Sequence, residues 1–161
     1  MTFNDKGLRA SGAALLIALL GGLSTPVLAS LGENQSSIEN DRMRMRASRA
    51  MEHRGLFSVH TLKTEDGSQI RQFVGMDGRV FAVRWNAMHK PDLSKLLGES
   101  WDGYGAAVRQ AARRGGIQRQ FHHAQGDVVV QSDAHLHIFS GYAYRRSLLP
   151  AGFSGERLAL E

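Results

Sequence analysis

Three short stretches in the first half of the chain alternate apolar and polar residues with a period of two, and this alternation restricts the fold more than any other feature. β-Branched and aromatic side chains are frequent in them. Asp66-Gly67 and Asp77-Gly78 separate them, and Asp-Gly pairs supply the positive φ angles that tight hairpins need. The pattern predicts an antiparallel meander of three strands at residues 56–63, 69–74 and 79–85.

The third stretch is apolar on both alternating sides. Strands that are buried on both faces read as nearly continuous apolar runs. We therefore expect this strand to lie in the middle of the sheet. The side chains concerned are Phe81, Val83 and Trp85 on one face and Val80 and Ala82 on the other.

Two helices are predicted after this strand. Pro91 and Asp92 suit the first turn of a short helix that ends at Gly98. Ser100 is placed to cap a longer helix, which Gly115-Gly116 ends. The apolar stripe of the longer helix is expected to lie on the sheet and consists of Trp101, Tyr104, Val108, Ala111 and Ala112.

The rest of the chain repeats the strand pattern, with a turn expected at residues 132–134. The second set of strands is predicted at residues 118–123, 128–131 and 136–144. The predicted fold class is therefore α+β. It has two antiparallel β-meanders of about six strands in all, joined by a helix packed on the sheet and preceded by a short basic helix.

The basic helix is predicted at residues 41–54, where nearly every residue is a strong helix former. Asp41 is placed to cap it and Gly55 to end it. Its cations Arg42, Arg46 and Arg49 share one side, which suits either a solvated helix or a helix that touches an anionic membrane. We favour the solvated helix because the opposite side has only Met and Ala. An alternation of arginines in the same segment would also suit a strand.

The first 29 residues have the layout of a secretory signal peptide. Lys6 and Arg9 precede an apolar run at residues 13–23. Small residues at Val27 and Ala29 then suit the narrow pocket of a signal peptidase. The run is shorter than the roughly 20 residues that span a bilayer. We expect export and cleavage after Ala29. The alternative is an uncleaved membrane anchor, which would also place the folded part outside the cytoplasm.

The remaining composition restricts chemistry and partners. The chain has no cysteine, which excludes disulfides, thiolate catalysis and cysteine-based metal sites. The net charge of +5 favours polyanionic envelope surfaces, whereas nucleic acid is an unsuitable partner for an exported chain without interleaved basic and aromatic residues. The expected segments are a signal peptide at 1–29, a polar terminus and basic helix at 30–55, one α+β domain at 56–150 and a loose C-terminal tail at 151–161.

Several sequence blocks carry a resemblance to a known family. They are VFAVRW at residues 80–85, PDLSKLLG at 91–98, VVVQS and HLHIFSGYAY within 128–144, and LLPAG at 148–152. Together they resemble a family of small exported proteobacterial proteins classed as a domain of unknown function. The resemblance implies bacterial origin and export, and it carries over no catalytic residue. It also implies that Arg or Lys often occupies the position of His137.

A histidine group is the strongest candidate for a metal site. His135 and His137 are two residues apart on a predicted strand, and His122 and His123 end a nearby strand. Imidazoles on one face of a sheet can bind zinc or copper. Asp127 or Asp133 would have to complete the ligand set. We favour a solvated sheet face, with Leu136 and Ile138 directed into the core, and predict neither a metal nor any other cofactor.

Other catalytic patterns are weaker. The stretch around Ser154 lacks the full G-x-S-x-G motif of a nucleophile elbow. Tyr142 and Tyr144 beside Arg145 and Arg146 suit either an exposed ligand strip or the edge of a core. A glycosidase would need a pair of catalytic carboxylates. The sequence does not single out two of the five candidates, which are Glu65, Asp66, Asp77, Glu99 and Asp102.

The sequence thus favours a non-catalytic envelope module that binds a protein, a polysaccharide or an anionic lipid surface. The alternative is a small hydrolase or a His-based metal-dependent enzyme. A concave pocket with converging His and carboxylate groups would favour the enzyme.

Overall fold

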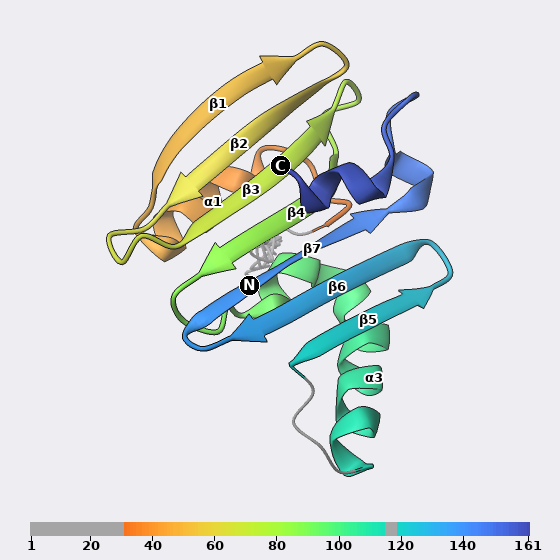
Figure 1. The fold of residues 1–161 in the computed structure, drawn as a ribbon. Helices are drawn as coiled ribbons and strands as arrows, with labels where there is room; N and C mark the ends of the chain where they lie inside the picture. The colour runs from red at the N-terminus through yellow and green to blue at the C-terminus, as the bar shows by residue number, and fades with distance from the viewer. Residues whose placement is uncertain (1–30, 115–118) are drawn as a thin grey trace, which may run out of the picture.

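The computed structural model describes residues 31–114 and 119–161, and all described strands form one antiparallel sheet (Figure 1). The strand order is β1-β2-β3-β4-β7-β6-β5. The strands are β1 Ser48–Arg54, β2 Phe57–Lys63, β3 Gln69–Gly75, β4 Val80–Ala87, β5 Gln120–Gln125, β6 Val128–His135 and β7 Ile138–Arg145. The helices are α1 Ser37–Met45, α2 Leu93–Leu97 and α3 Trp101–Arg113, with short 3-10 turns η1 Gly98–Ser100, η2 Arg146–Leu148 and η3 Gly155–Ala159.

The α+β class is confirmed, but the predicted count of six strands is wrong. The sheet has seven strands, four in the meander that ends at β4 and three in the meander that ends at β7. β4 pairs with β7, so the two meanders make one continuous sheet. β4 lies in the middle with both faces buried, as predicted. The part of the chain that the structure describes has no helix long and apolar enough to cross a bilayer.

The predicted basic helix at residues 41–54 is wrong in its second half. The helix α1 lies further towards the amino terminus and ends before Arg46, whose φ is 51°. Residues 48–54 form β1 instead and pair with the whole length of β2. Without β1, the backbone groups along the edge of β2 would be unpaired. This pairing outweighs helix propensity, because a helix at residues 48–54 would have almost no apolar face to bury.

The arginines of this segment do not form a free cationic face. Arg42 and Arg49 both form ion pairs with Glu39, at N to O distances of 2.7 Å and 3.4 Å. Arg46 forms no ion pair among residues 31–114 and 119–161. The described contacts therefore give no support to a basic helix that binds membranes.

The helices cover one face of the sheet. Beneath them lies a core to which α1, α2, α3 and both meanders contribute, with Trp85 among its largest buried side chains. The strand residues of this core are Leu62, Ile70, Val74, Val80, Val83, Trp85, Val130 and Ala143.

The opposite face is covered by the C-terminal segment, so the prediction of a loose tail at residues 151–161 is wrong. Phe153 is 8% exposed and Leu158 is fully buried. The Phe153 ring lies 5.2 Å from the rings of both Phe57 and Phe81, edge to face. Gly155 lies against Tyr144, where a Cβ would be 2.2 Å from the ring. Aromatic burial on the sheet therefore orders a segment whose composition looks mobile.

We predict that Phe153→Ala lowers the free energy of unfolding by about 3 kcal/mol, because truncation of a buried Phe leaves a cavity. Leu160→Ala is the control, since Leu160 is 90% exposed and its loss should change stability by less than about 0.5 kcal/mol. Urea denaturation measures both. Equal effects would show that the C-terminal segment does not pack on the sheet.

Candidate functional site

The histidines singled out by the sequence do not converge. His122 pairs across the sheet with Gln131, whereas His135 pairs with Ile138 at the far end of β6. His135 lies four positions along the strand from Gln131, which is about 13 Å at 3.3 Å per residue. The described residues contain no group of three metal-ligating side chains. This geometry gives no support to the metal site.

The predicted turn at residues 132–134 is wrong, and this error misplaced the histidines. β6 continues to His135 because it pairs with β7 over its whole length. The turn falls at Leu136 and His137 instead. Leu136 has a φ of 55° and is 86% exposed, and Ile138 is 44% exposed, so the prediction that both point into the core is also wrong.

The candidate carboxylates belong to turns and helix starts. Asp66 and Asp77 lie at opposite ends of β3, and Glu99 and Asp102 are exposed on the helical run before and within α3. Ser154, just before η3, has no hydrogen-bonded base among the described residues. These positions do not assemble either of the predicted hydrolase sites.

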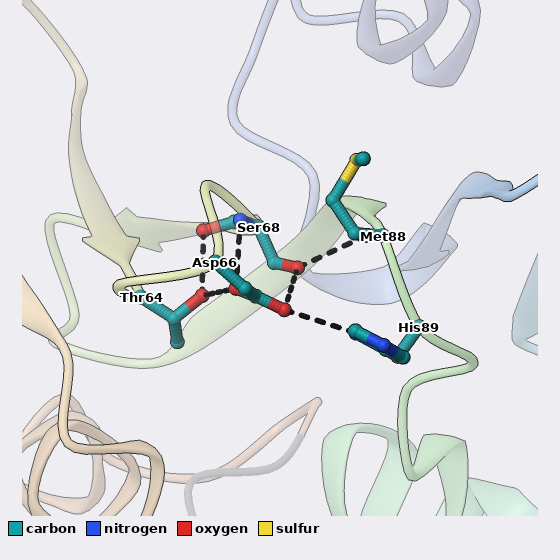
Figure 2. A network of polar contacts seen from close by, with 5 residues as sticks. All are labelled: Thr64, Asp66, Ser68, Met88 and His89. Atoms are coloured by element: carbon teal, nitrogen blue, oxygen red, sulfur yellow. Dashed lines mark hydrogen bonds and ion pairs between the residues drawn. The ribbon is translucent and has the colours of Figure 1, made fainter.

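Asp66 is the centre of a polar network that joins the β2–β3 turn to the loop after β4 (Figure 2). Its carboxylate accepts hydrogen bonds from the Thr64 hydroxyl and from the Ser68 backbone and hydroxyl. These bonds, that of Thr64 first, hold the pKa of Asp66 far below its usual range. The second carboxylate oxygen also lies 3.2 Å from Nδ1 of His89. With its pKa lowered in this way, the Asp66 carboxylate is a weak base. It therefore suits a structural role rather than proton transfer.

A buried serine and histidine that the sequence analysis missed lie on β2, next to β1. Ser58 Oγ is 3.1 Å from Nε2 of His60, and the other ring nitrogen, Nδ1, is 2.8 Å from Nη2 of Arg49. Because a guanidinium can only donate, Nδ1 must accept and Nε2 must carry the proton. His60 therefore donates to Ser58 and cannot take its proton. Burial, assisted by the charge of Arg49, lowers the pKa of His60 to about 4.

Asp41 occupies the same layer and attaches α1 to the sheet. Its carboxylate is fully buried, accepts a 2.8 Å hydrogen bond from the Gln72 side chain and forms an ion pair with Arg44. Burial raises the pKa of Asp41 to about 6, against the opposing charge of Arg44. The sequence pattern indicated a helix cap at this position, whereas the side chain is a buried anchor in the middle of α1.

The tyrosines of β7 lie at the edge of the aromatic core. Their rings are stacked with centroids 6.4 Å apart, and Tyr142 donates a 3.0 Å hydrogen bond to Gln131. The neighbouring Arg145 pairs with Asp127 at 3.0 Å. These contacts favour the core-edge interpretation over an exposed ligand strip.

A groove of about 290 Å³ between α3 and the sheet is the best candidate for a binding site, and we call it the α3 groove. Only the first part of the predicted stripe is tightly packed. Tyr104 is buried, whereas Val108 and Ala111 are partly exposed and Ala112 is exposed. The lining is mostly apolar: Trp85, Pro91, Leu93, Tyr104, Val108, Ala111, Ala112, Phe121, Ala134 and Phe139, with Lys90, Arg119, Ser132 and Asp133.

Polar groups of the α3 groove are few. The Tyr104 hydroxyl lies 2.9 Å from Ser132 Oγ, and burial raises the pKa of this phenol. Lys90 and Arg119 are exposed, so they stand where the groove meets solvent. Asp133 follows Ser132 on β6, and strand alternation turns its side chain towards the opposite face of the sheet. The groove therefore combines an apolar interior with two cations at its rim.

A second cleft of about 400 Å³ lies between the end of α1, the β2–β3 turn and the loop after β4. It is lined by the exposed Glu65 and by Asp66 and His89, which already contact each other. The α3 groove is the stronger candidate because ligand sites are mostly apolar with a few convergent polar groups.

Comparison with known proteins gave one result. A family model with the description "Protein of unknown function (DUF2844)" matches residues 27–158. Curated proteins gave no match, and neither did solved structures.

We predict that Asp41 and His60 give opposite pH dependences of stability. The folded pKa of Asp41, about 6, lies above its ordinary 3.8, so its contribution to stability is lost as pH rises towards 6. The folded pKa of His60, about 4, lies below its ordinary 6.5, so its contribution is gained over that range. Between pH 4 and 6 the two effects largely cancel.

Single substitutions separate these effects. With rising pH, Asp41→Asn should gain stability relative to the wild type, and His60→Gln should lose it, each by up to about 1.4 kcal/mol per pH unit. Urea denaturation at several pH values between 4 and 7 measures the differences. Slopes of the same sign in both variants would contradict the assignment.

Proposed function

The chain belongs to the family described as protein of unknown function DUF2844, and we propose that it is a non-catalytic, exported module of the bacterial envelope. In this proposal it binds a small amphipathic molecule in the α3 groove. The ligand has an apolar body and an anionic head.

The observation that carries this proposal is the chemistry of the groove. Its interior is lined by aromatic and aliphatic side chains from α3, β4, β5, β6 and β7. A volume of about 290 Å³ suits a ligand at the small end of the usual range. Lys90 and Arg119 can bind an anionic head at the rim, where charge-assisted hydrogen bonds form readily.

A binding role also agrees with the state of the polar groups. Tyr104 and Ser132 are hydrogen-bonded to each other, and within residues 31–114 and 119–161 neither hydroxyl forms a hydrogen bond with a histidine or a carboxylate. The Tyr104 ring contacts His123 edge to face, with centroids 6.2 Å apart. His60 carries its proton on the nitrogen that faces Ser58. General base catalysis needs a free acceptor within hydrogen-bond reach of the proton it removes, and these pairs do not offer one.

We predict that dodecanoate, an apolar chain with a carboxylate, binds with one site per chain in isothermal titration calorimetry. Ala111→Phe should weaken binding by about tenfold or more, because the new ring fills the groove. Ala106→Phe is the matched control, since Ala106 lies on the same helix, is exposed and is absent from the lining.

The head group is tested with charge variants. The double variant Lys90→Gln and Arg119→Gln should weaken dodecanoate binding by about tenfold, while Arg109→Gln on the exposed side of α3 should leave it unchanged. Dodecyltrimethylammonium should bind weakly to the wild type. Equal affinity for both head groups, or equal effects of the two Phe variants, would overturn the assignment of the groove.

Export is proposed from the amino-terminal pattern of Lys6, Arg9, the apolar run and Ala29. We predict that the protein recovered from the envelope fraction of the bacterium begins at Ser30, as read by N-terminal sequencing. Ala29→Phe should block cleavage because the pocket of signal peptidase accepts small residues. An intact amino terminus in the membrane fraction would support the anchor, and a cytoplasmic protein would refute export.

A further inference from the structure

The turn between β6 and β7 presents large apolar side chains to solvent. Residues 135–138 are all exposed, and Leu136 is 86% and Ile138 44% exposed. Met88 of the neighbouring loop is 47% exposed. Exposed apolar side chains that gather at one place commonly mark an interaction site.

Strand pairing places these side chains at one end of the sheet. Ala87, the residue before Met88, pairs with Phe139, and Phe139 pairs with Ala134. The Ala134 amide donates a 2.7 Å hydrogen bond to the carbonyl of Arg119. The β6–β7 turn, the loop after β4 and the start of β5 are therefore neighbours, as Figure 1 shows. We call Met88, Lys90, Arg119, Leu136 and Ile138 the β6–β7 end.

Leu136 is an unfavourable residue for its backbone conformation. Its φ of 55° lies in the left-handed region, where a tight hairpin turn ordinarily has Gly, Asn or Asp. The position therefore combines an unfavourable conformation with an unfavourable exposure. Such departures from local rules are typical of functional positions.

Two cations, Lys90 and Arg119, flank the apolar side chains. Lys90 and Arg119 form no ion pair within residues 31–114 and 119–161. Of the nearby carboxylates, Asp92 forms an ion pair with Lys95, and Asp66 lies 3.2 Å from the imidazole of His89. Glu65 and the partly buried Asp133 are the other acidic residues close to this end. Unpaired cations beside exposed apolar groups complement an anionic lipid surface.

The loop that carries Met88 and Lys90 is held in place before any partner binds. The Met88 amide donates a 3.0 Å hydrogen bond to Ser68 Oγ, and His89 contacts Asp66 (Figure 2). Preorganisation of this kind lowers the entropy lost on binding.

We propose that the β6–β7 end docks on an anionic phospholipid bilayer. Leu136, Ile138 and Met88 enter the interface, and Lys90 and Arg119 contact lipid phosphates. Docking itself does not depend on the α3 groove. Because Lys90 and Arg119 also stand at the rim of that groove, docking would place its opening next to the lipid, and this consequence rests on the proposed function.

The test uses the form that begins at Ser30, which contains every residue of both cores. It should cosediment with vesicles of phosphatidylglycerol and phosphatidylcholine, and much less with phosphatidylcholine alone. Leu136→Asn should lower the partition coefficient by about tenfold, because one apolar anchor is lost. The same variant should keep or raise the melting temperature, because Asn tolerates positive φ. A purely structural role for Leu136 would not separate the two readouts in this way.

Met76→Asn is the matched control. Met76 is 82% exposed in the turn between β3 and β4, at the other end of the sheet, so vesicle binding should not change. Lys90→Gln with Arg119→Gln should reduce binding by about tenfold or more, and raised salt should do the same to the wild type.

Two results would overturn the proposal. One is vesicle binding that ignores salt and responds equally to Leu136→Asn and Met76→Asn. The other is absence of vesicle binding together with a wild-type dimer that Leu136→Asn converts to a monomer in light scattering, which would make a second copy the occupant. Ala111→Phe keeps the two proposals apart, since it should abolish dodecanoate binding and leave vesicle binding intact.

Discussion

The pairing of β4 with β7 is the contact on which the rest of the structure depends. It joins a four-stranded and a three-stranded meander into one sheet, and it runs from Ala82 opposite Tyr144 to Ala87 opposite Phe139. Trp85 crosses this junction and packs on Gly141, where a Cβ would lie 2.5 Å from the indole. A glycine at this position leaves room for the largest buried side chain of the sheet, and both cores include residues of this junction.

The two faces of the sheet are closed in different ways, and the difference creates the groove. On the face with Phe73 and Phe81, a short C-terminal segment seals an aromatic cluster. On the other face, α3 packs firmly at Tyr104 but leaves Val108 and Ala111 partly uncovered above β5 and β6. A helix that covers a sheet incompletely leaves apolar surface open to a small molecule. Lys90 and Arg119 at the same end of the sheet favour ligands with a negative charge.

Features that depend on local sequence could be predicted. The Asp-Gly turns have the positive φ angles expected of them, at Gly67 and Gly78, and α3 begins and ends where its flanking residues indicate. Features that depend on distant pairing could not. The composition of residues 48–54 is typical of a helix, but these residues form a strand because they pair with β2. The composition around Phe153 is typical of a mobile tail, but its ring packs against the rings of Phe57 and Phe81. The apolar stripe of α3 could be predicted from the sequence. The α3 groove could not, because the spacing of apolar residues does not show how completely a helix covers a sheet.

The position of Phe153 and Leu158 late in the sequence affects when the fold can close. Both residues belong to the aromatic cluster, whose other members lie earlier in the chain. β4 likewise pairs with β7, which lies far from it along the chain. Contacts between distant residues form slowly, since the intervening chain has to lose conformational freedom first. In a polypeptide that emerges with its amino terminus leading, the aromatic cluster would thus remain open until Phe153 and Leu158 arrive. If the chain is exported as proposed, late closure of this kind would keep it unfolded during passage through a translocation channel.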